Sequence, residues 1–361
     1  MPLLIFKDAV FTQGDLDVEE GIEFDDNFNL ENNLSIGQAT SNEIRFTLFN
    51  DDKLLNNYKF GEFTATIGVH VSTETYQQVS PVMINTSKAR YYGYNSMPFI
   101  RRNDVILSAQ PSFAVKSMLG YDGKVWAFSD DGRYAVYDDS SGINITSTVS
   151  VNRFMRNKSK EWAGKGYFYN PKSRKLAIYE SGIRYWYEFV PLGVFIAERP
   201  KVPDQIAISM NCYDQMTKLD KDMPTASELG ITYPTTIGKL FTKICKYVDV
   251  PYETDTFINS TAEIKKEPDD FRNVTMRQVI MWIAEAAGSN AKFNRDGKLV
   301  FAWLNPTTQS YDEGDYTRFS PTWYETKTID KLYSRDTASG RDKTIGNGKV
   351  AYLIQDNPLL K

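Results

Sequence analysis

The chain has 361 residues and a formal net charge of −4 at neutral pH, and 41% of its residues are hydrophobic. This length predicts roughly two to four domains, and the hydrophobic content is typical of folded chains. Proteins that read DNA sequence are usually basic, so the acidic balance argues against that class. Aromatic residues reach 14%, which favours pleated strands over helices. We therefore predict a multidomain α+β fold that is mainly β.

The N-terminal sequence MPLLIFKDAVF lacks a basic start followed by a long apolar run, so we expect no signal peptide. No stretch approaches the roughly 18 apolar residues of a membrane helix, so we expect no membrane insertion and synthesis in the cytoplasm. The only cysteines, Cys212 and Cys245, are too few for a disulfide scaffold or a cysteine zinc site. We expect two buried, reduced thiols.

Residues 1–81 show the polar–apolar alternation of half-buried antiparallel strands, most clearly at 44–49 and 63–69. The same polar–apolar alternation recurs in residues 186–234, where 206–210 is a predicted strand. We therefore predict that 1–81 and 186–234 form one split β domain.

Residues 82–185 lie between these two parts and are rich in Tyr and Trp. The runs 125–128 and 133–137 flank an Asp-Gly turn, and 166–169 and 175–179 flank a second turn, so both pairs are predicted hairpins. We predict an inserted antiparallel β domain here, because the ends of a hairpin loop lie close together.

Residues 235–311 contain the two clearest helices and form a predicted small α+β domain. The first helix has an apolar stripe and a cap at Thr235 or Thr236. In the second, Thr275 and Gln278 have capping-box spacing, and Gly288 occupies the C-terminal left-handed position. The two predicted apolar faces comprise Ile237, Leu240, Phe241, Ile244 and Val248, and Val279, Ile280, Ile283, Ala284 and Ala287.

A hairpin around Asp296 and Gly297 follows the second helix, and we expect both helices to pack together or on it. Residues 312–361 are predicted to belong to a second β domain. Within it, 340–348 is rich in glycine and charge and is predicted to be a flexible loop. It lacks the Gly-Lys-Thr order of a phosphate loop.

His70 is the only histidine, so any Ser-His-Asp or Cys-His mechanism must use it. It lies in an ordinary predicted strand, and neither cysteine has a motif around it. We expect a surface or structural role for His70 and no histidine zinc site.

Five carboxylate pairs are the remaining acidic candidates. Each lies beside Asn, Gly, Ser or Pro, where Asp usually forms turns, although a glycosidase pair or a calcium ligand stays open as an alternative. The pairs are Asp25 with Asp26, Asp51 with Asp52, Asp130 with Asp131, Asp138 with Asp139, and Asp269 with Asp270.

Two basic segments, Arg101 with Arg102 and the run 153–160 before Trp162, could bind a phosphate backbone or an acidic glycan. A solvated loop is the expected alternative. Aromatic rings of 82–185 could stack on sugars, although most are expected to form its core. We therefore assign no catalytic, cofactor-binding or metal residue and predict no enzyme activity.

The order of several segments resembles that of bacteriophage tail hub proteins. This family includes the tail-associated proteins of long-tailed phages of Gram-positive hosts and the baseplate hubs of contractile tails. The resemblance covers most of 20–81, 186–305 and 324–361. The segments that carry it are 24–30 (FDDNFNL), 34–42 (LSIGQATSN), 191–201 (PLGVFIAERPK), 208–220 (ISMNCYDQMTKLD), 275–291 (TMRQVIMWIAEAAGSNA) and 356–360 (DNPLL).

The resemblance implies two related tube-type β-barrel domains that form a homotrimeric ring at the virion tail tip. Such a ring joins the distal tail and tail tube proteins and the tape measure to a spike or fibre, and DNA only passes through its lumen. The resemblance implies a shorter connection where 82–185 stands and more helix and strand after 357–358. The sequence could thus be a short member or a piece of a longer one.

Two further alternatives stay open. One is a glycan-binding or glycan-cleaving tail protein acting on the host surface, supported by the 82–185 aromatics and the acidic pairs. The other is an unrelated β protein. For a hub ring, we expect a hydrophilic lumen wall from 1–81, 206–210 and 324–361, without a broad basic patch that would hold DNA.

Overall fold

The computed structural model forms two compact units. Unit 1 comprises Met1–Glu23, Arg45–Leu192 and Ile196–Asn211, and unit 2 comprises Phe24–Ile44, Gly193–Phe195 and Cys212–Lys361. The four-part division predicted from sequence is finer than this, and its bounds remain predictions. The structure describes all residues except 1, 7–9, 18–20, 27–34, 51–53, 76–81, 122, 132, 150–164, 171, 198–205, 304–330, 337–339, 347–350, 356 and 361.

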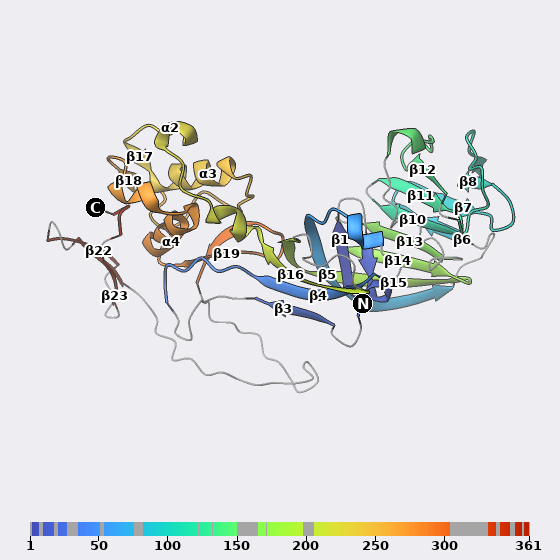
Figure 1. Cartoon of the computed structure of the whole chain (residues 1–361), viewed down its shortest axis with the longest axis horizontal. Helices are drawn as coiled ribbons and strands as arrows, with labels where there is room; N and C mark the ends of the chain where they lie inside the picture. The colour runs from blue at the N-terminus through green and yellow to red at the C-terminus, as the bar shows by residue number, and fades with distance from the viewer. Residues whose placement is uncertain are drawn as a thin grey trace. The chain divides into compact units, whose positions relative to one another are not determined.

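The largest sheet has 12 strands, and most of its residues lie in unit 1 (Figure 1). Its main path runs β12 (Tyr134–Asp138), β11 (Lys124–Phe128), β10 (Ser117–Tyr121), β13 (Lys165–Asn170), β14 (Lys175–Glu180), β15 (Ile183–Ile196), β16 (Ala207–Asp214), β4 (Glu43–Phe49) and β3 (Ile22–Asp25). A branch adds β5 (Glu62–Thr75), β1 (Pro2–Phe6) and β2 (Val10–Thr12).

This sheet confirms the predicted mainly-β fold class. The predicted hairpins are also present, since β11 pairs with β12 and β13 pairs with β14, both antiparallel. Pairing of the described strands is branched and does not return on itself. The barrel closure that the resemblance implied is therefore not formed by the described strands.

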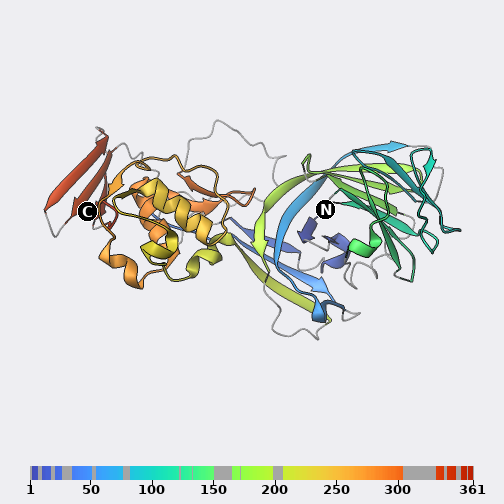
Figure 2. The same cartoon turned by 90° about the horizontal axis from the view of Figure 1, so that it is seen from above.

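A four-stranded sheet of unit 1 covers the strands at one end of the large sheet. It comprises β6 (Val82–Asn85), β7 (Arg90–Gly93), β8 (Ile100–Arg102) and β9 (Val105–Ile106), which are seen from another side in Figure 2 (light blue to teal). The core between the sheets buries Tyr91, Tyr137 and Tyr179. Gly166 permits this packing, because a Cβ there would lie 2.1 Å from the carbonyl oxygen of Met83. These tyrosines of 82–185 therefore pack in the core, as expected for most of its aromatic rings.

Unit 2 contains the two predicted helices, α3 (Ile237–Tyr247) and α4 (Met276–Ala286) (Figure 1). The Thr236 hydroxyl accepts the first hydrogen bond of α3 from the Lys239 amide, and Thr275 caps α4 through the Gln278 amide. Gly288 has φ +64°, as predicted. The pattern of apolar positions and caps was therefore sufficient to predict both helices.

Both helices share one core with the predicted hairpin, β19 (Asn290–Phe293) and β20 (Leu299–Ala302). The predicted packing is confirmed, with Leu240, Phe241 and Ile283 fully buried. The other elements of unit 2 are α2 (Ala226–Leu229), β17 (Thr235–Thr236), β18 (Glu263–Ile264), β21 (Lys331–Asp336), β22 (Arg341–Gly346) and β23 (Ala351–Gln355). Short 3-10 helices lie at Gln13–Asp15, Leu54–Asn57, Thr146–Thr148, Gln215–Asp220 and Asp269–Asn273.

The prediction of a flexible loop at 340–348 is wrong for its described part. Arg341–Gly346 is strand β22, which pairs antiparallel with β21. Its threonine and isoleucine favour a strand, and the flanking glycines concealed that signal. The β character predicted for 312–361 is confirmed in its described part at β21, β22 and β23.

A segment from the N-terminal part of the chain, residues 36–42, adds to the hairpin of unit 2. The Gln38 amide donates to Asn290 Oδ1 (3.0 Å), and the Ala291 amide donates to the Gln38 carbonyl (2.8 Å). Gly37 has φ +85°, and a Cβ there would lie 2.8 Å from Glu285 Cβ. Glycine is therefore required at this close approach.

The buried carboxylate of Asp214 fixes the end of this segment. One carboxylate oxygen accepts from the Asn42 amide (2.8 Å), and the other accepts from the Ser41 hydroxyl (2.9 Å) and the Met216 amide (3.0 Å). The last bond caps the 3-10 helix Gln215–Asp220. Burial raises the pKa of Asp214, against these three hydrogen bonds.

We predict that Ile283→Asp unfolds unit 2, because an unpaired charge would replace a fully buried side chain. Burial of such a side chain contributes about 1.5–3 kcal/mol, before the cost of the charge. Thermal unfolding of the full chain, followed by circular dichroism, measures the loss. Lys243→Asp, on the exposed face of α3, is the control and should melt like the wild type. Equal melting of both variants would show that the buried face is wrongly assigned.

We predict that Asp214→Ala lowers the free energy of unfolding by about 2–4 kcal/mol, because three donors lose their acceptor.

A second variant, Asp214→Asn, tests the charge of this side chain. A raised folded-state pKa means that the aspartate stabilises most below its unfolded pKa and loses this contribution as pH rises through the folded pKa. The stability difference between wild type and Asp214→Asn should therefore shrink with rising pH. Denaturant titrations at several pH values measure it, and a constant difference contradicts the assignment.

Candidate functional site

His70 lies on strand β5 and is exposed, as predicted for a surface histidine. Its Nε2 lies 2.9 Å from the Thr73 hydroxyl, and its ring centroid lies 5.4 Å from that of Tyr187. Both cysteines lie in unit 2, whereas His70 lies in unit 1. The structure thus gives the only histidine a local strand contact.

The two cysteines are buried and outside any disulfide, as predicted. Cys245 lies on α3, in the apolar core that α3 and α4 share, and burial raises the pKa of its thiol to about 12. A thiol with this pKa is protonated at neutral pH and is a poor nucleophile.

In three of the described carboxylate pairs, at least one residue has a structural partner. Asp131 forms an ion pair with Arg133 (2.7 Å), and Asp26 forms one with Lys292 (2.5 Å). Asp139 accepts from the Thr86 hydroxyl (2.7 Å). Asp130 and Asp131 lie in a turn, as predicted. Asp269 and Asp270 begin a 3-10 helix. Asp51 and Asp52 lie outside the described residues.

Within the described part of the chain, no group of three or more His, Cys, Asp or Glu side chains could hold a metal ion. Among the same residues, no helix has the length and apolar character needed to cross a membrane.

The two predicted basic segments have different outcomes. Residues 153–160 and Trp162 lie outside the described residues. Arg101 stacks over the Tyr92 ring at 4.3 Å, and Arg102 donates to the Ser140 carbonyl (3.0 Å). Both arginines therefore support unit 1 locally.

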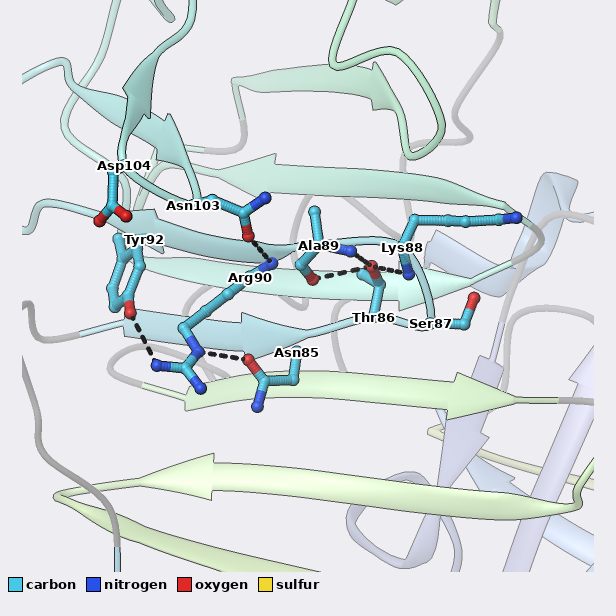
Figure 3. Close-up of a pocket in the computed structure, with 9 residues that line it drawn as sticks. All are labelled: Asn85, Thr86, Ser87, Lys88, Ala89, Arg90, Tyr92, Asn103 and Asp104. Carbon is cyan, nitrogen blue, oxygen red and sulfur yellow. Dashed lines mark hydrogen bonds between the residues drawn. The ribbon is translucent and has the colours of Figure 1, made fainter.

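The structure brings together a polar pocket that sequence reasoning missed. It has a volume of about 400 Å³ and lies between the β6–β7 turn and the β8–β9 turn (Figure 3). Amides, hydroxyls and charged groups dominate its lining. The lining residues are Asn85, Thr86, Ser87, Lys88, Ala89, Arg90, Tyr92, Asn103 and Asp104.

Arg90 is held in a fixed orientation at this pocket. Its Nε donates to Asn85 Oδ1 (2.9 Å), and its Nη1 donates to the Tyr92 hydroxyl (3.2 Å) (Figure 3). The bond to Tyr92 raises the pKa of Arg90, although burial opposes it, and the nearby Asp104 adds a smaller increase. Arg90 is therefore a permanent, oriented cation.

The two turns that frame the pocket are fixed by side-chain hydrogen bonds. The Thr86 hydroxyl accepts from the amides of Lys88 (3.1 Å) and Ala89 (2.9 Å). Asn103 has φ +52°, and its Oδ1 accepts from the Arg90 amide (2.9 Å). The signal in the sequence was a polar turn, Asn85 to Arg90, between two apolar strands, but such turns are common.

The second unusual surface is an edge of strand β5. Strand β1 pairs with β5 only from Phe63 to Ile67. Strand β15 pairs with β5, and contacts near both ends of β5 locate it: Ala197 donates to the Gly61 carbonyl (3.0 Å), and Arg184 forms an ion pair with Glu74. We call residues 69–75 the β5 edge segment. Among the described strands, none pairs with its edge opposite β15.

This segment continues an apolar stripe. Ile67, Val69 and Val71 alternate along the strand and are 43%, 58% and 54% exposed. An exposed edge usually carries charges or proline that prevent pairing with another chain. Here Glu74 is the one carboxylate of the edge segment. The segment therefore has the character of a surface that another strand covers.

No family model matches this chain, and no curated protein matches it. Among solved structures, one similar chain is the 43 kDa tail protein of prophage MuSo2 from Shewanella oneidensis. The two chains are 10% identical, the match covers 98% of this chain and 71% of that chain, and the TM-score is 0.33. At this TM-score, the likeness assigns neither fold nor function to this chain.

We predict that both cysteines resist alkylation by iodoacetamide in the native chain and react fully in denaturant, because both thiols are buried and burial also raises the pKa of Cys245. Mass spectrometry at neutral pH counts the labels. Native labelling at the rate of a free cysteine would contradict the burial of these residues.

Proposed function

We propose that this chain is a structural protein of a bacteriophage tail tip that forms a homotrimeric ring of the tail-hub kind. The ordered sequence segments that resemble hub proteins support this, and the mainly-β fold agrees with it. In this role, the ring continues the tail tube and binds distal tail and tube proteins, the tape measure, and a spike or fibre. DNA only passes through the lumen, and the chain has no catalytic role.

The β5 edge segment is the observation that carries this proposal. It combines an edge that no described strand covers with exposed Val69 and Val71. Strand addition would pair the backbone along this edge, and side chains of the added strand would pack beside the valines. A second copy of the chain is the partner that a ring supplies, through a heterologous contact whose rotation closes at three.

The lumen of such a ring must release DNA. A wall lined with Lys and Arg would bind the phosphates, and the net charge of −4 agrees with a wall of another character. In this proposal, strands of 1–81, 206–210 and 324–361 line the lumen, and 82–185 lies outside it.

A glycan-binding or glycan-cleaving tail protein is the second candidate function. The polar pocket beside Arg90 favours binding, because its amides and hydroxyls match the hydrogen-bonding groups of sugars. Cleavage has less support among the described residues, since Asp26, Asp131 and Asp139 have structural partners. Hydrolysis of cell-wall glycan by the purified chain would favour the second candidate over the ring.

We predict that Val69→Lys weakens self-association of the chain by about tenfold or more, because the ammonium would have to lose its water in the covered edge. Sedimentation velocity at increasing concentration measures the effect. Val105→Lys is the matched control, since Val105 is 66% exposed on β9, which belongs to a different sheet from the β5 edge segment. An equal effect of both substitutions would exclude the β5 edge segment as the contact.

Assembly in the virion needs its own measurement, because neighbouring tail proteins can be required for ring closure. Electron microscopy of virions labelled with an antibody against this chain should show label at the tail tip. Label elsewhere, or tight DNA binding by the purified chain at physiological salt, would overturn the hub proposal.

A further inference from the structure

We propose that the polar pocket of unit 1 binds an extended glycan carrying carboxylate or phosphate groups, with Arg90 as the anion contact. This site is separate from the β5 edge segment. The proposal rests on the second candidate function, glycan binding, and adds the class of ligand and its anion contact; it does not depend on the ring. Its lining explains the ligand class, because it offers several hydrogen-bonding side chains and its surface is mostly polar. An apolar ligand would gain little binding free energy in such a pocket.

Arg90 supplies the specificity for an anion. Asn85 and Tyr92 hold two of its nitrogens, so the guanidinium plane is fixed before a ligand arrives. Among the described residues, no acceptor lies on its Nη2. A guanidinium with a fixed plane and remaining donors suits the paired oxygens of a carboxylate or phosphate.

The ligand is expected to be longer than a single ion. Figure 3 shows the Lys88 ammonium pointing away from the Arg90 guanidinium, so the two cations do not converge on one anion. The side chains of Ser87 and Asn103 lie in the lining between the two turns. A chain of sugar units with repeated charges would reach Arg90 and Lys88 and bond to the polar groups between them.

Asp104 restricts where the anion binds. It lies in the same lining, and its charge acts on Arg90. It would repel an anionic group placed beside it and would accept a hydrogen bond from a sugar hydroxyl. The site thus favours a ligand that alternates hydroxyls with negative groups over one that is anionic throughout.

The two turns are held by hydrogen bonds before a ligand binds, so binding loses little conformational entropy in these loops. Thr86 accepts two backbone amides of its turn and donates to Asp139, which is itself buried. Asn103 binds the Arg90 backbone at both its amide (2.6 Å) and its side chain (2.9 Å). A preformed pocket spends less binding energy on immobilising loops.

Nuclear magnetic resonance titration of the full chain tests the proposal with four probes: trigalacturonate, short poly(glycerol phosphate), neutral maltotriose and inorganic phosphate. We expect one of the anionic polymers to shift the amide signals of Ser87 and Asn103, and maltotriose to shift them weakly or not at all. The polymer that binds distinguishes a carboxylate source from a phosphate source. Equal binding of maltotriose, absence of polymer binding, or inorganic phosphate binding as tightly as the polymers would overturn the proposal.

Arg90→Gln should lower affinity for the anionic polymer by about tenfold or more. Arg90→Lys keeps the charge but loses the planar fork, so it should recover only part of the affinity. Lys172→Ala, in the exposed turn between β13 and β14, is the control and should bind like the wild type. Amide signals outside the pocket report whether each variant is folded. Unchanged affinity of folded Arg90→Gln would overturn the role of Arg90.

Discussion

A buried carboxylate, Asp214, ties the 36–42 segment to the part of unit 2 that follows strand β16. Asp214 binds the end of the 36–42 segment through Ser41 and Asn42, and it caps the next 3-10 helix through the Met216 amide. A buried charge is costly without partners, and these three donors offset part of that cost, since burial still raises the pKa of Asp214. The same segment lies along the β19–β20 hairpin, so the position of Asp214 couples the start of the chain to the helical core.

The parts of the fold that could be predicted are those with local signals. Helix α4 has a capping threonine, Thr275, an apolar face around Ile283, and Gly288 after its end. Together these local signals predict the helix without knowledge of its tertiary contacts. The attachment of Gln38 to Asn290 has no comparable signal, because the two residues are 252 positions apart. Strand β22 was missed because its flanking glycines suggested a loop.

The candidate site was less predictable than the fold. His70, the cysteines and the acidic pairs were the candidates visible in the sequence. In the structure, His70 and Asp131 have local contacts and both cysteines are buried. The polar pocket depends on two turns meeting in space, and only pairing of β6 to β9 brings Arg90 and Asn103 together. The exposed face of β5 was visible as alternation, but its uncovered edge depends on where β1 ends.

The three-part construction of unit 2 has a consequence for its synthesis on the ribosome. The 36–42 segment is translated early, yet its partners Asp214 and Asn290 emerge much later, and Asn357 then donates to the Trp282 carbonyl (2.9 Å). The early segment must stay unpaired, or bind a chaperone, while about 250 residues are added, which takes tens of seconds at ordinary elongation rates. Slow codons or chaperones that act on the nascent chain would therefore influence the yield of unit 2 more than that of locally paired hairpins such as β13–β14.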